Sequence, residues 1–288
     1  MRIKNQAEIF FISSKRSVFL PKRIEIIRQK VYNVIIENVQ KQEGKKLHKG
    51  MTFLFQGDSI TDGGRKRSMD ANHILGHGYQ YIVSAKLALE YCSCGFKFIN
   101  KGVTGEAIEN IYARLKKDVT IYKPDVVSFL AGANDIERGV GREHGTVTDD
   151  YINIYADMIH DLRAELPDTV IMICEPFYVE TDNYNEPYKN SPHVMCEEYF
   201  KPLNIPKNDK HIKWKSEEIK LMQTALAQFA AENRCIYVPL QKEFDRYCKK
   251  ASAEYFVWDC IHPTVAGHEI IAENWLSAAN KYILKKEY

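Results

Sequence analysis

The chain lacks the features that would place it at once in a specialised class of protein. Its seven cysteines include no Cys-x-x-Cys pair, and no apolar stretch approaches the ~20 residues of a membrane span. The apolar patch in the opening segment MRIKNQAEIFFISSKR is shorter than the core of a signal peptide, which needs about 7–15 residues. There is no internal repeat and no low-complexity segment. We therefore expect a soluble, cytoplasmic protein whose thiols are reduced.

Charge and cysteine spacing argue against several kinds of partner. The net charge is only +2, so nothing draws the chain as a whole to nucleic acid or to a membrane. The cysteines lie mostly in apolar runs, and their spacings do not fit a zinc site. We expect no metal and no cofactor. The basic excess is local: residues 1–50 carry 12 Lys+Arg and 4 Asp+Glu, and subtraction from the totals of 40 and 38 leaves 28 and 34 for residues 51–288.

Residues 1–50 are interpreted as a basic N-terminal extension of the domain at 51–288. Within the extension, apolar residues recur at spacings of three and four from Pro21 onward, which predicts one helix that stops at Gly44. This helix would pack on the domain, form a dimerisation arm, or belong to a poorly ordered tail, and Met51 is a candidate natural start. The sequence leaves the oligomeric state open.

After Met51, short apolar runs alternate with amphipathic segments. Strands are expected at MTFLFQ, FKFIN, DVVSFLAG, TVIMICEP and CIYVPL, and helices at 79–91, 106–119, 149–166, 216–233 and 265–281. The strands lack strict polar alternation, as expected when both faces of a sheet are buried. The pattern predicts an α/β fold with a five-stranded parallel sheet covered by helices on both faces. An irregular stretch at about 178–214 is expected to be a long insertion loop, and whether it is a lid stays open.

Polar motifs follow the predicted strands at the points where they end. They are GDSIT (57–61), NKGVTGE (100–106), GAND (132–135) and, before the last helix, WDCIHPT (258–264). Sites in open parallel sheets form beyond the carboxyl ends of the strands. The sequence therefore predicts one site at this edge of the sheet.

These motifs, in this order, resemble the blocks of the SGNH hydrolases, also called the GDSL lipase/esterase family, over residues 52–280. The resemblance implies a flavodoxin-like three-layer α/β/α sandwich and a serine esterase. FQGDSITDGGR, with GHGY at 76–79, is similar to the carbohydrate-esterase, acetylxylan-esterase-like branch. Gly-x-Ser-x-Gly is absent, so we do not expect a sharp nucleophile elbow, and the site should be shallow.

The catalytic hypothesis centres on Ser59, His262 and Asp259. A serine hydroxyl needs a base within hydrogen-bond reach to become a nucleophile, and His262 is the candidate. Asp259, three residues earlier, can accept from the other ring nitrogen and fix the tautomer. Pro263 favours extended conformations for His262. Taken without the other motifs, His262 would be interpreted as an ordinary loop histidine.

The resemblance implies three oxyanion donors: the backbone N–H groups of Ser59 and Gly105 and the side-chain amide of Asn134. Ser59 would begin a helix, whose free N–H groups favour negative charge. Gly105 would let the backbone approach the substrate closely. The structural alternatives are that Asn134 caps the next segment and that Gly105 is a turn glycine.

The remaining acidic residues of the motifs are expected to support loops. Asp58 and Asp135 would brace backbone N–H groups, and Asp62 would cap the turn that follows it. As a cluster, the three could instead serve a metal-dependent phosphoesterase. Three other histidines are not expected to be catalytic. His268 is expected to be structural, and His73 and His77 are expected to lie in loops at the surface.

The predicted substrate is a short-chain ester, acetyl especially, of a carbohydrate or a similar polar alcohol. Four aromatic residues are candidates to bind it: Tyr79, Tyr184, Tyr188 and Trp214. Aromatic faces pack against sugar rings, but those of the long loop could equally form a small buried core. The alternatives to this function are a lysophospholipase or thioesterase of the same family, a phosphoesterase, and a non-catalytic binding protein.

Overall fold

Five short strands form a sheet that is parallel throughout, in the order β2-β1-β3-β4-β5. The strands are β1 (Thr52–Gly57), β2 (Lys97–Asn100), β3 (Val126–Leu130), β4 (Val170–Cys174) and β5 (Ile236–Val238). The first strand, β1, lies second in this order, and the chain then steps outward to β2 and returns past β1 to β3. This is the flavodoxin-like order, whose switch point lies between β1 and β3, and it confirms the fold predicted from the sequence.

The structure is a computed structural model that describes residues 47–68, 70–181 and 209–284. The helix expected after Pro21 and most of the expected loop at 178–214 lie outside these residues. Within them, no helix is both long and apolar enough to cross a membrane.

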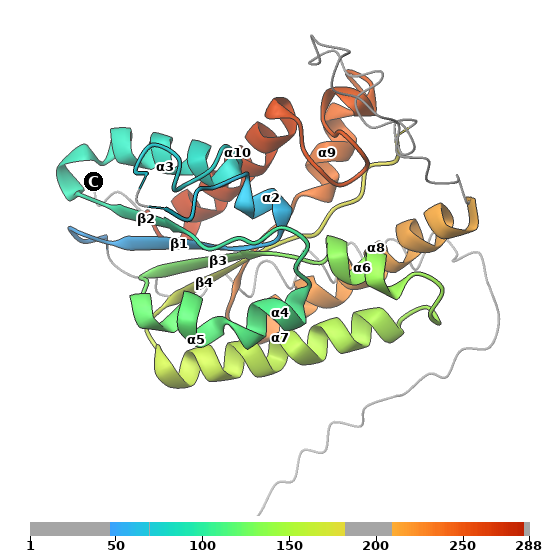
Figure 1. Ribbon diagram of the computed structural model, residues 1–288, viewed down its shortest axis with the longest axis horizontal. Coiled ribbons are helices and arrows are strands. Elements are labelled where there is room, and N and C mark those ends of the chain that lie inside the picture. The colour runs from blue at the N-terminus through green and yellow to red at the C-terminus, as the bar shows by residue number, and fades with distance from the viewer. Residues whose placement is uncertain (1–46, 69, 182–208, 285–288) are drawn as a thin grey trace, which may run out of the picture.

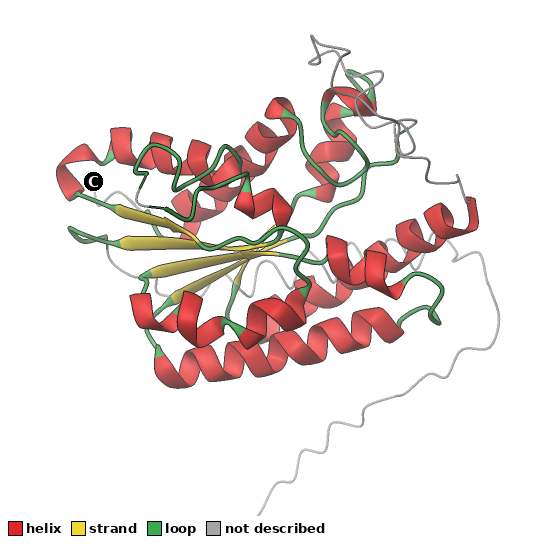
Figure 2. Cartoon of the chain, viewed as in Figure 1, coloured by secondary structure: helices red, strands yellow, loops and turns green. Residues whose placement is uncertain are grey.

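Helices cover both faces of the sheet (Figure 1). One face carries α3 (Tyr79–Glu90), α9 (Gln241–Tyr247) and α10 (Val265–Tyr282). The other carries α4 (Ile108–Ala113), α5 (Leu115–Asp118), α7 (Thr146–Glu165) and α8 (Asp209–Glu232). Figure 2 shows the three layers that result, with the sheet between two sets of helices.

Each strand contributes to two hydrophobic cores, which explains why its sequence does not alternate between apolar and polar residues. On β1, Phe53 and Phe55 enter the core under α3 and α10, and Leu54 enters the core on the opposite face. Trp275 of α10 packs on both phenylalanines, at ring-centroid distances of 6.3 and 5.5 Å. Its indole N–H donates to Ser128 Oγ at 2.9 Å, which satisfies the one polar group of a fully buried side chain.

Two predicted helices differ from the structure. The helix expected at 106–119 is divided into α4 and α5 at Arg114, whose guanidinium bonds Glu106 and Asp118 on either side. Helix α8 begins at Asp209 instead of 216, so the end of the expected irregular stretch is helical. The added turns are held by tertiary contacts, in which Lys215 pairs with Glu137.

Two short helices, α2 (Ser59–Asp62) and α6 (Ala133–Gly139), follow β1 and β3 almost directly. A helix that begins at Ser59 was expected from the sequence, whereas α6 was not predicted. The GDSIT and GAND motifs therefore start helices at the carboxyl edge of the sheet. This matters for the site, because each motif places free helix N–H groups at that edge.

Candidate active site

Ser59 is the first residue of α2, two residues beyond the end of β1. Asp58 caps the helix, and its Oδ1 accepts the N–H of Ile60 at 3.0 Å. The strand therefore ends, and the helix starts, with Ser59 half-buried at the sheet edge. Its backbone N–H belongs to the first turn of a helix, where an anionic oxygen is favoured.

Gly57 makes this tight turn possible. A Cβ atom at Gly57 would lie 2.2 Å from the carbonyl oxygen of Leu130 and 2.4 Å from Thr61 Oγ1. Neither approach is sterically allowed, so the glycine is required because β3 and α2 both press against the end of β1. The glycine of the GDSIT motif thus has a packing reason that is independent of any chemistry.

Ser59, His262 and Asp259 form a chain of hydrogen bonds. Ser59 Oγ lies 2.8 Å from His262 Nε2, and His262 Nδ1 lies 2.7 Å from Asp259 Oδ2. A proton on Nδ1, directed at the carboxylate, leaves Nε2 free to accept from the serine hydroxyl. This arrangement can take a proton from the hydroxyl as an acyl carbon is attacked.

The loop before α10 fixes the positions of Asp259 and His262. Asp259 Oδ1 accepts the N–H of His262 at 2.9 Å and that of Ile261 at 3.3 Å, so the carboxylate closes the Asp-x-x-His turn on itself. Trp258 donates its N–H to the carbonyl of His262 at 2.7 Å. Next, Thr264 caps α10 by accepting the N–H of Gly267. The Asp-x-x-His spacing therefore forms a short rigid turn that leads directly into the helix.

Electrostatics favour a charged pair at Asp259 and His262. Burial alone would lower the pKa of His262, but the hydrogen bond to Asp259 and its negative charge outweigh burial and raise that pKa above the usual value. Burial opposes ionisation of Asp259 as well, yet the bonds it accepts from His262 lower its pKa overall. An imidazolium formed during a reaction would thus be stabilised in place.

Gly105 and Asn134 lie in two segments that are bonded to each other. Asn134, in the first turn of α6, donates through Nδ2 to the carbonyl of Glu106 at 3.0 Å. An amide nitrogen carries two hydrogens, so one remains available to a ligand. Gly105 has φ +83°, and a Cβ there would meet open space. A glycine is thus required at this position by the backbone conformation and not by packing.

The segment that carries Gly105 is also bonded to the Ser59 turn. Val103 donates its N–H to the carbonyl of Gly57 at 2.9 Å. Thr104 donates its N–H and its hydroxyl to Asp62 Oδ2, at 3.0 and 3.2 Å. These bonds place the residue before Gly105 directly against the helix that Ser59 begins, and thereby bring the predicted oxyanion donors to one edge.

The motif aspartates make backbone contacts. Asp62 accepts the N–H of Arg65, as expected for a turn cap, and both oxygens of Asp135 accept the N–H of Ile108, at 3.1 and 3.3 Å. Burial raises the pKa of Asp135 to about 6. Among the described residues, no three His, Cys, Asp or Glu side chains are grouped so that they could hold a metal ion.

Asp58 differs from the other aspartates, because it is fully buried and its Oδ2 has no hydrogen-bond partner among the described residues. Burial raises its pKa to about 7, against the opposing effects of the Ile60 N–H and the charge of His262. The residue next to the nucleophile candidate is therefore a carboxyl group that changes charge near neutral pH.

Of the four candidate substrate-binding aromatics, the structure describes Tyr79 and Trp214. Tyr79 is fully buried, its ring meets Phe55 edge-on, and its hydroxyl lies 3.3 Å from Thr61 Oγ1. The expectation that Tyr79 contacts substrate is therefore wrong, because it is a core residue at the start of α3. Tyr184 and Tyr188 lie outside the described residues.

Trp214 has a packing role in the structure. Its indole N–H donates to the carbonyl of Arg142 at 2.9 Å, and its ring stacks on His144 at a centroid distance of 5.4 Å. The contact fixes α8 against the turn between α6 and α7. His268, expected to be structural, accepts the N–H of Tyr79 at 3.1 Å, and burial lowers its pKa to about 3.

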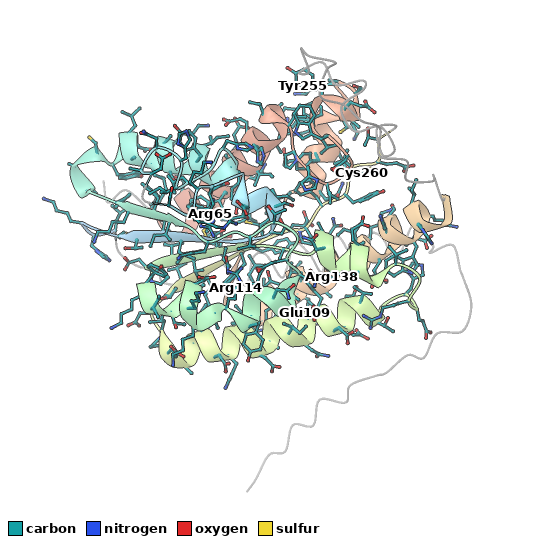
Figure 3. All side chains as sticks on the ribbon, in the orientation of Figure 1. Arg65, Glu109, Arg114, Arg138, Tyr255 and Cys260 are labelled. Atoms are coloured by element: carbon teal, nitrogen blue, oxygen red, sulfur yellow. The ribbon has the colours of Figure 1, made fainter. Side chains whose placement is uncertain are left out.

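Two polar residues organise the site and were given no role from the sequence. Asn100 is buried at the end of β2, where Nδ2 donates to the carbonyl of Thr61 at 2.7 Å and Oδ1 accepts the N–H of Gly102 at 2.9 Å. Arg138 of α6, labelled in Figure 3, donates to the carbonyl of Gly105 at 2.8 Å. Asn100 stood in a quoted motif at a strand end, whereas no sequence signal marked Arg138.

Comparison with known proteins adds independent findings. An acetylxylan esterase from Geobacillus stearothermophilus is 29% identical over 235 residues, which are 80% of this chain and 94% of that protein. A structure of that enzyme with one tryptophan replaced has a TM-score of 0.63 at 26% identity and covers 84% of this chain and all of the other. Further structures of it, with a serine or an aspartate replaced by alanine, are described as catalytic mutants.

The solved structure of a different protein, a candidate GDSL-like lipase from Parabacteroides merdae, has a TM-score of 0.68 at 25% identity. It covers 83% of this chain, and 99% of its own length is matched. The model of the GDSL-like Lipase/Acylhydrolase family matches residues 55–270, which include every motif described above. The chain belongs to the GDSL-like lipase/acylhydrolase family and is a serine esterase.

Proposed function

We propose that this esterase removes acetyl groups from a carbohydrate or a similar polar alcohol through an acyl-enzyme formed on Ser59. The observation that supports it most is the hydrogen bond of 2.8 Å between Ser59 Oγ and His262 Nε2, with Asp259 on the other ring nitrogen. A hydroxyl held against a base whose tautomer is fixed is what acyl transfer to serine requires.

In the proposed reaction, Ser59 Oγ attacks the acetyl carbonyl carbon as its proton passes to His262 Nε2. Asp259 stabilises the imidazolium that forms. The developing oxyanion accepts hydrogen bonds from the N–H groups of Ser59 and Gly105 and from the free amide hydrogen of Asn134. When the intermediate collapses, the alcohol leaves with the proton from His262. Water then attacks the acetyl-serine with His262 as base, and acetate is released.

Two observations support a polar acetylated substrate. The acetylxylan esterase from Geobacillus stearothermophilus matches this chain over 94% of its own length, so the likeness covers nearly all of that enzyme. In addition, the surroundings of Gly105 are polar, since Asn134 and Arg138 both donate to carbonyl groups of this segment. Such surroundings favour the hydroxyl groups of a sugar over an alkyl chain.

The test is a comparison of acyl chains and of alcohols on the purified protein. We expect kcat/KM for p-nitrophenyl acetate to exceed that for the octanoate and palmitate esters, and acetate release from acetylated xylo-oligosaccharides to be faster still. Ser59→Ala should abolish all of these activities while the circular dichroism spectrum is retained. A preference for the long acyl chains would instead assign a lysophospholipase or thioesterase and would overturn the proposed substrate class.

A further inference from the structure

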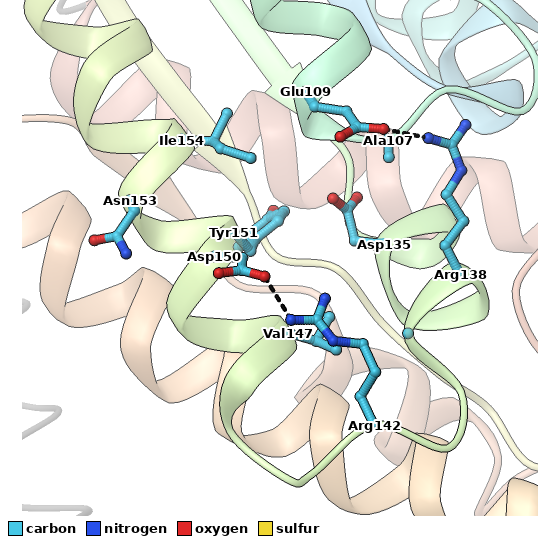
Figure 4. A pocket seen from close by; sticks show the side chains of 11 residues that line it. Ala107, Glu109, Asp135, Arg138, Arg142, Val147, Asp150, Tyr151, Asn153 and Ile154 are labelled. Atoms are coloured by element: carbon cyan, nitrogen blue, oxygen red, sulfur yellow. Dashed lines mark hydrogen bonds and ion pairs between the residues drawn. The ribbon is translucent and has the colours of Figure 1, made fainter.

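A cavity of about 290 Å³ opens between α6, α7 and the start of α4 (Figure 4). We call it the α6–α7 trough. Its polar lining residues are Glu109, Asp135, Arg138, Arg142, Asp150 and Asn153. None of them except Asp135 was singled out from the sequence, and the proposed reaction uses none of them directly.

Asp135 supplies hydrogen-bond acceptors at the centre of the trough. Figure 4 shows its carboxyl group between the side chains of Arg138 and Arg142. Both oxygens accept the backbone N–H of Ile108, at 3.1 and 3.3 Å. Since an ionised carboxylate has about four lone-pair sites, acceptor capacity remains for a ligand.

Two arginines supply donors on either side. Arg142 pairs with Asp150 at 2.6 Å, and Arg138 pairs with Glu109 at 2.9 Å. About half of each guanidinium side chain is exposed, and each guanidinium carries five N–H donors, which these bonds do not exhaust. With three carboxyl groups beside two guanidinium groups, the trough repels multiply charged anions and suits a neutral ligand that both donates and accepts.

Part of the lining is apolar. Val147 and the ring of Tyr151 are buried side chains of α7 that border the trough, and Ala107 and Ile154 extend this surface. A concave site with an apolar wall and a few convergent donors and acceptors is the usual form of a small-molecule site. A pyranose ring matches it, because its C–H face is apolar and its rim carries hydroxyl groups that donate and accept.

The trough is connected to the candidate active site through α6. Asp135 directly follows Asn134, and Arg138, which lines the trough, donates to the carbonyl of Gly105 at 2.8 Å. A ligand in the trough would therefore lie next to the segment that holds the proposed oxyanion donors. A linear oligosaccharide with its ester at Ser59 would extend along this surface.

We infer that the α6–α7 trough is a second subsite, which binds a sugar residue that carries no ester in the same oligosaccharide substrate. The inference rests on the proposed function, because it assumes a carbohydrate alcohol. It assigns Asp135 and Arg142 as polar contacts of that sugar and Val147 as part of its apolar platform. It also predicts that oligosaccharides are better substrates than acetylated monosaccharides.

The binding test is independent of catalysis. Isothermal titration of the Ser59→Ala protein with unesterified xylotetraose should show binding that Arg142→Ala weakens about three- to tenfold, as expected for the loss of one or two hydrogen bonds. Asn153→Trp, on the exposed rim, should block it. Arg246→Ala is the matched control, since Arg246 is an equally exposed arginine with one acidic partner, Glu243, on α9. Absent binding, or equal binding in all variants, would overturn the inference.

A kinetic test separates this inference from the proposed function. In the protein with Ser59 intact, Arg142→Ala and Asn153→Trp should raise KM for acetylated xylo-oligosaccharides, with kcat and the rate on p-nitrophenyl acetate unchanged. An unchanged KM on the oligosaccharide would overturn the subsite while the esterase stands. If no acetylated carbohydrate is hydrolysed although p-nitrophenyl acetate is, the proposed substrate class fails, and the titration still decides whether the trough binds sugar.

Discussion

Ser59 and His262 are separated by 203 positions in the sequence, and their side chains meet at 2.8 Å. The topology explains this contact. Ser59 follows β1, which lies second in the sheet. His262 precedes α10, which packs beside α3 on one face of the sheet. Both therefore arrive at the carboxyl edge of the sheet beside the switch point between β1 and β3, where ligands bind in folds of this kind.

This contact predicts how activity depends on pH. The base must be neutral, and Asp259 raises the pKa of His262 above its ordinary value. Activity should therefore fall as pH drops, with a midpoint in kcat/KM above the ~6.5 of an unperturbed imidazole. The measurement is kcat/KM for p-nitrophenyl acetate from pH 5 to pH 9. A flat profile, or a midpoint clearly below 6, would speak against His262 as the base.

Asn134 is predicted to act in the transition state. Asn134→Ala removes one proposed oxyanion donor, so kcat should fall by about 10²–10³-fold with little change in KM. Stopped-assay kinetics on p-nitrophenyl acetate and a thermal melt measure the two effects separately. Asn233→Ala is the control, because Asn233 also donates to a backbone carbonyl, that of Phe229, at the end of α8. Equal kinetics in both variants would leave Asn134 with a structural role only.

Asp58 is predicted to make stability depend on pH in the opposite direction to an ordinary carboxylate. Burial raises its pKa from 3.8 to about 7, so the folded protein holds this proton more tightly than the unfolded chain. Tighter binding of this proton stabilises the folded protein at low pH. The stabilisation is lost from the free energy of unfolding as pH rises from about 4 to about 7, because the unfolded chain releases the proton first. Asp58→Asn keeps the oxygen that caps Ile60 and removes the ionisation.

The melting temperature of Asp58→Asn relative to the wild type should therefore increase between pH 5 and pH 8. Thermal melts of both proteins across this range measure it. Asp168→Asn changes an exposed aspartate and should show no such trend. If the difference between Asp58→Asn and the wild type stayed constant with pH, Asp58 would be ionised or neutral throughout and the assigned burial effect would be wrong.

The sheet could be predicted from the sequence because its strands are short, apolar and buried on both faces. The run MTFLFQ locates β1 to within one residue, since Phe53, Leu54 and Phe55 all enter a core. The order of the motifs and their likeness to known blocks then predicted which edge would carry the site. Both predictions depend on apolar runs and motifs of neighbouring residues, which can be recognised without knowledge of tertiary contacts.

What could not be predicted depends on tertiary contacts. Tyr79 was a candidate for substrate binding at the start of a correctly predicted helix, but its ring is buried against Phe55. The break at Arg114 arises from partners on both sides of it, and the early start of α8 from the pairing of Lys215 with Glu137. Asn100 and Arg138 act by reaching backbone carbonyls of other segments, which no spacing in the sequence reveals.

The central claim is that Ser59 is the nucleophile of this esterase. The most direct measurement is peptide mass spectrometry of the protein after reaction with a fluorophosphonate probe. The account predicts a single adduct, on Ser59, formed at a rate that matches the loss of p-nitrophenyl acetate hydrolysis. An inactivated protein with its adduct on another residue, or an active protein that forms no adduct, would contradict it.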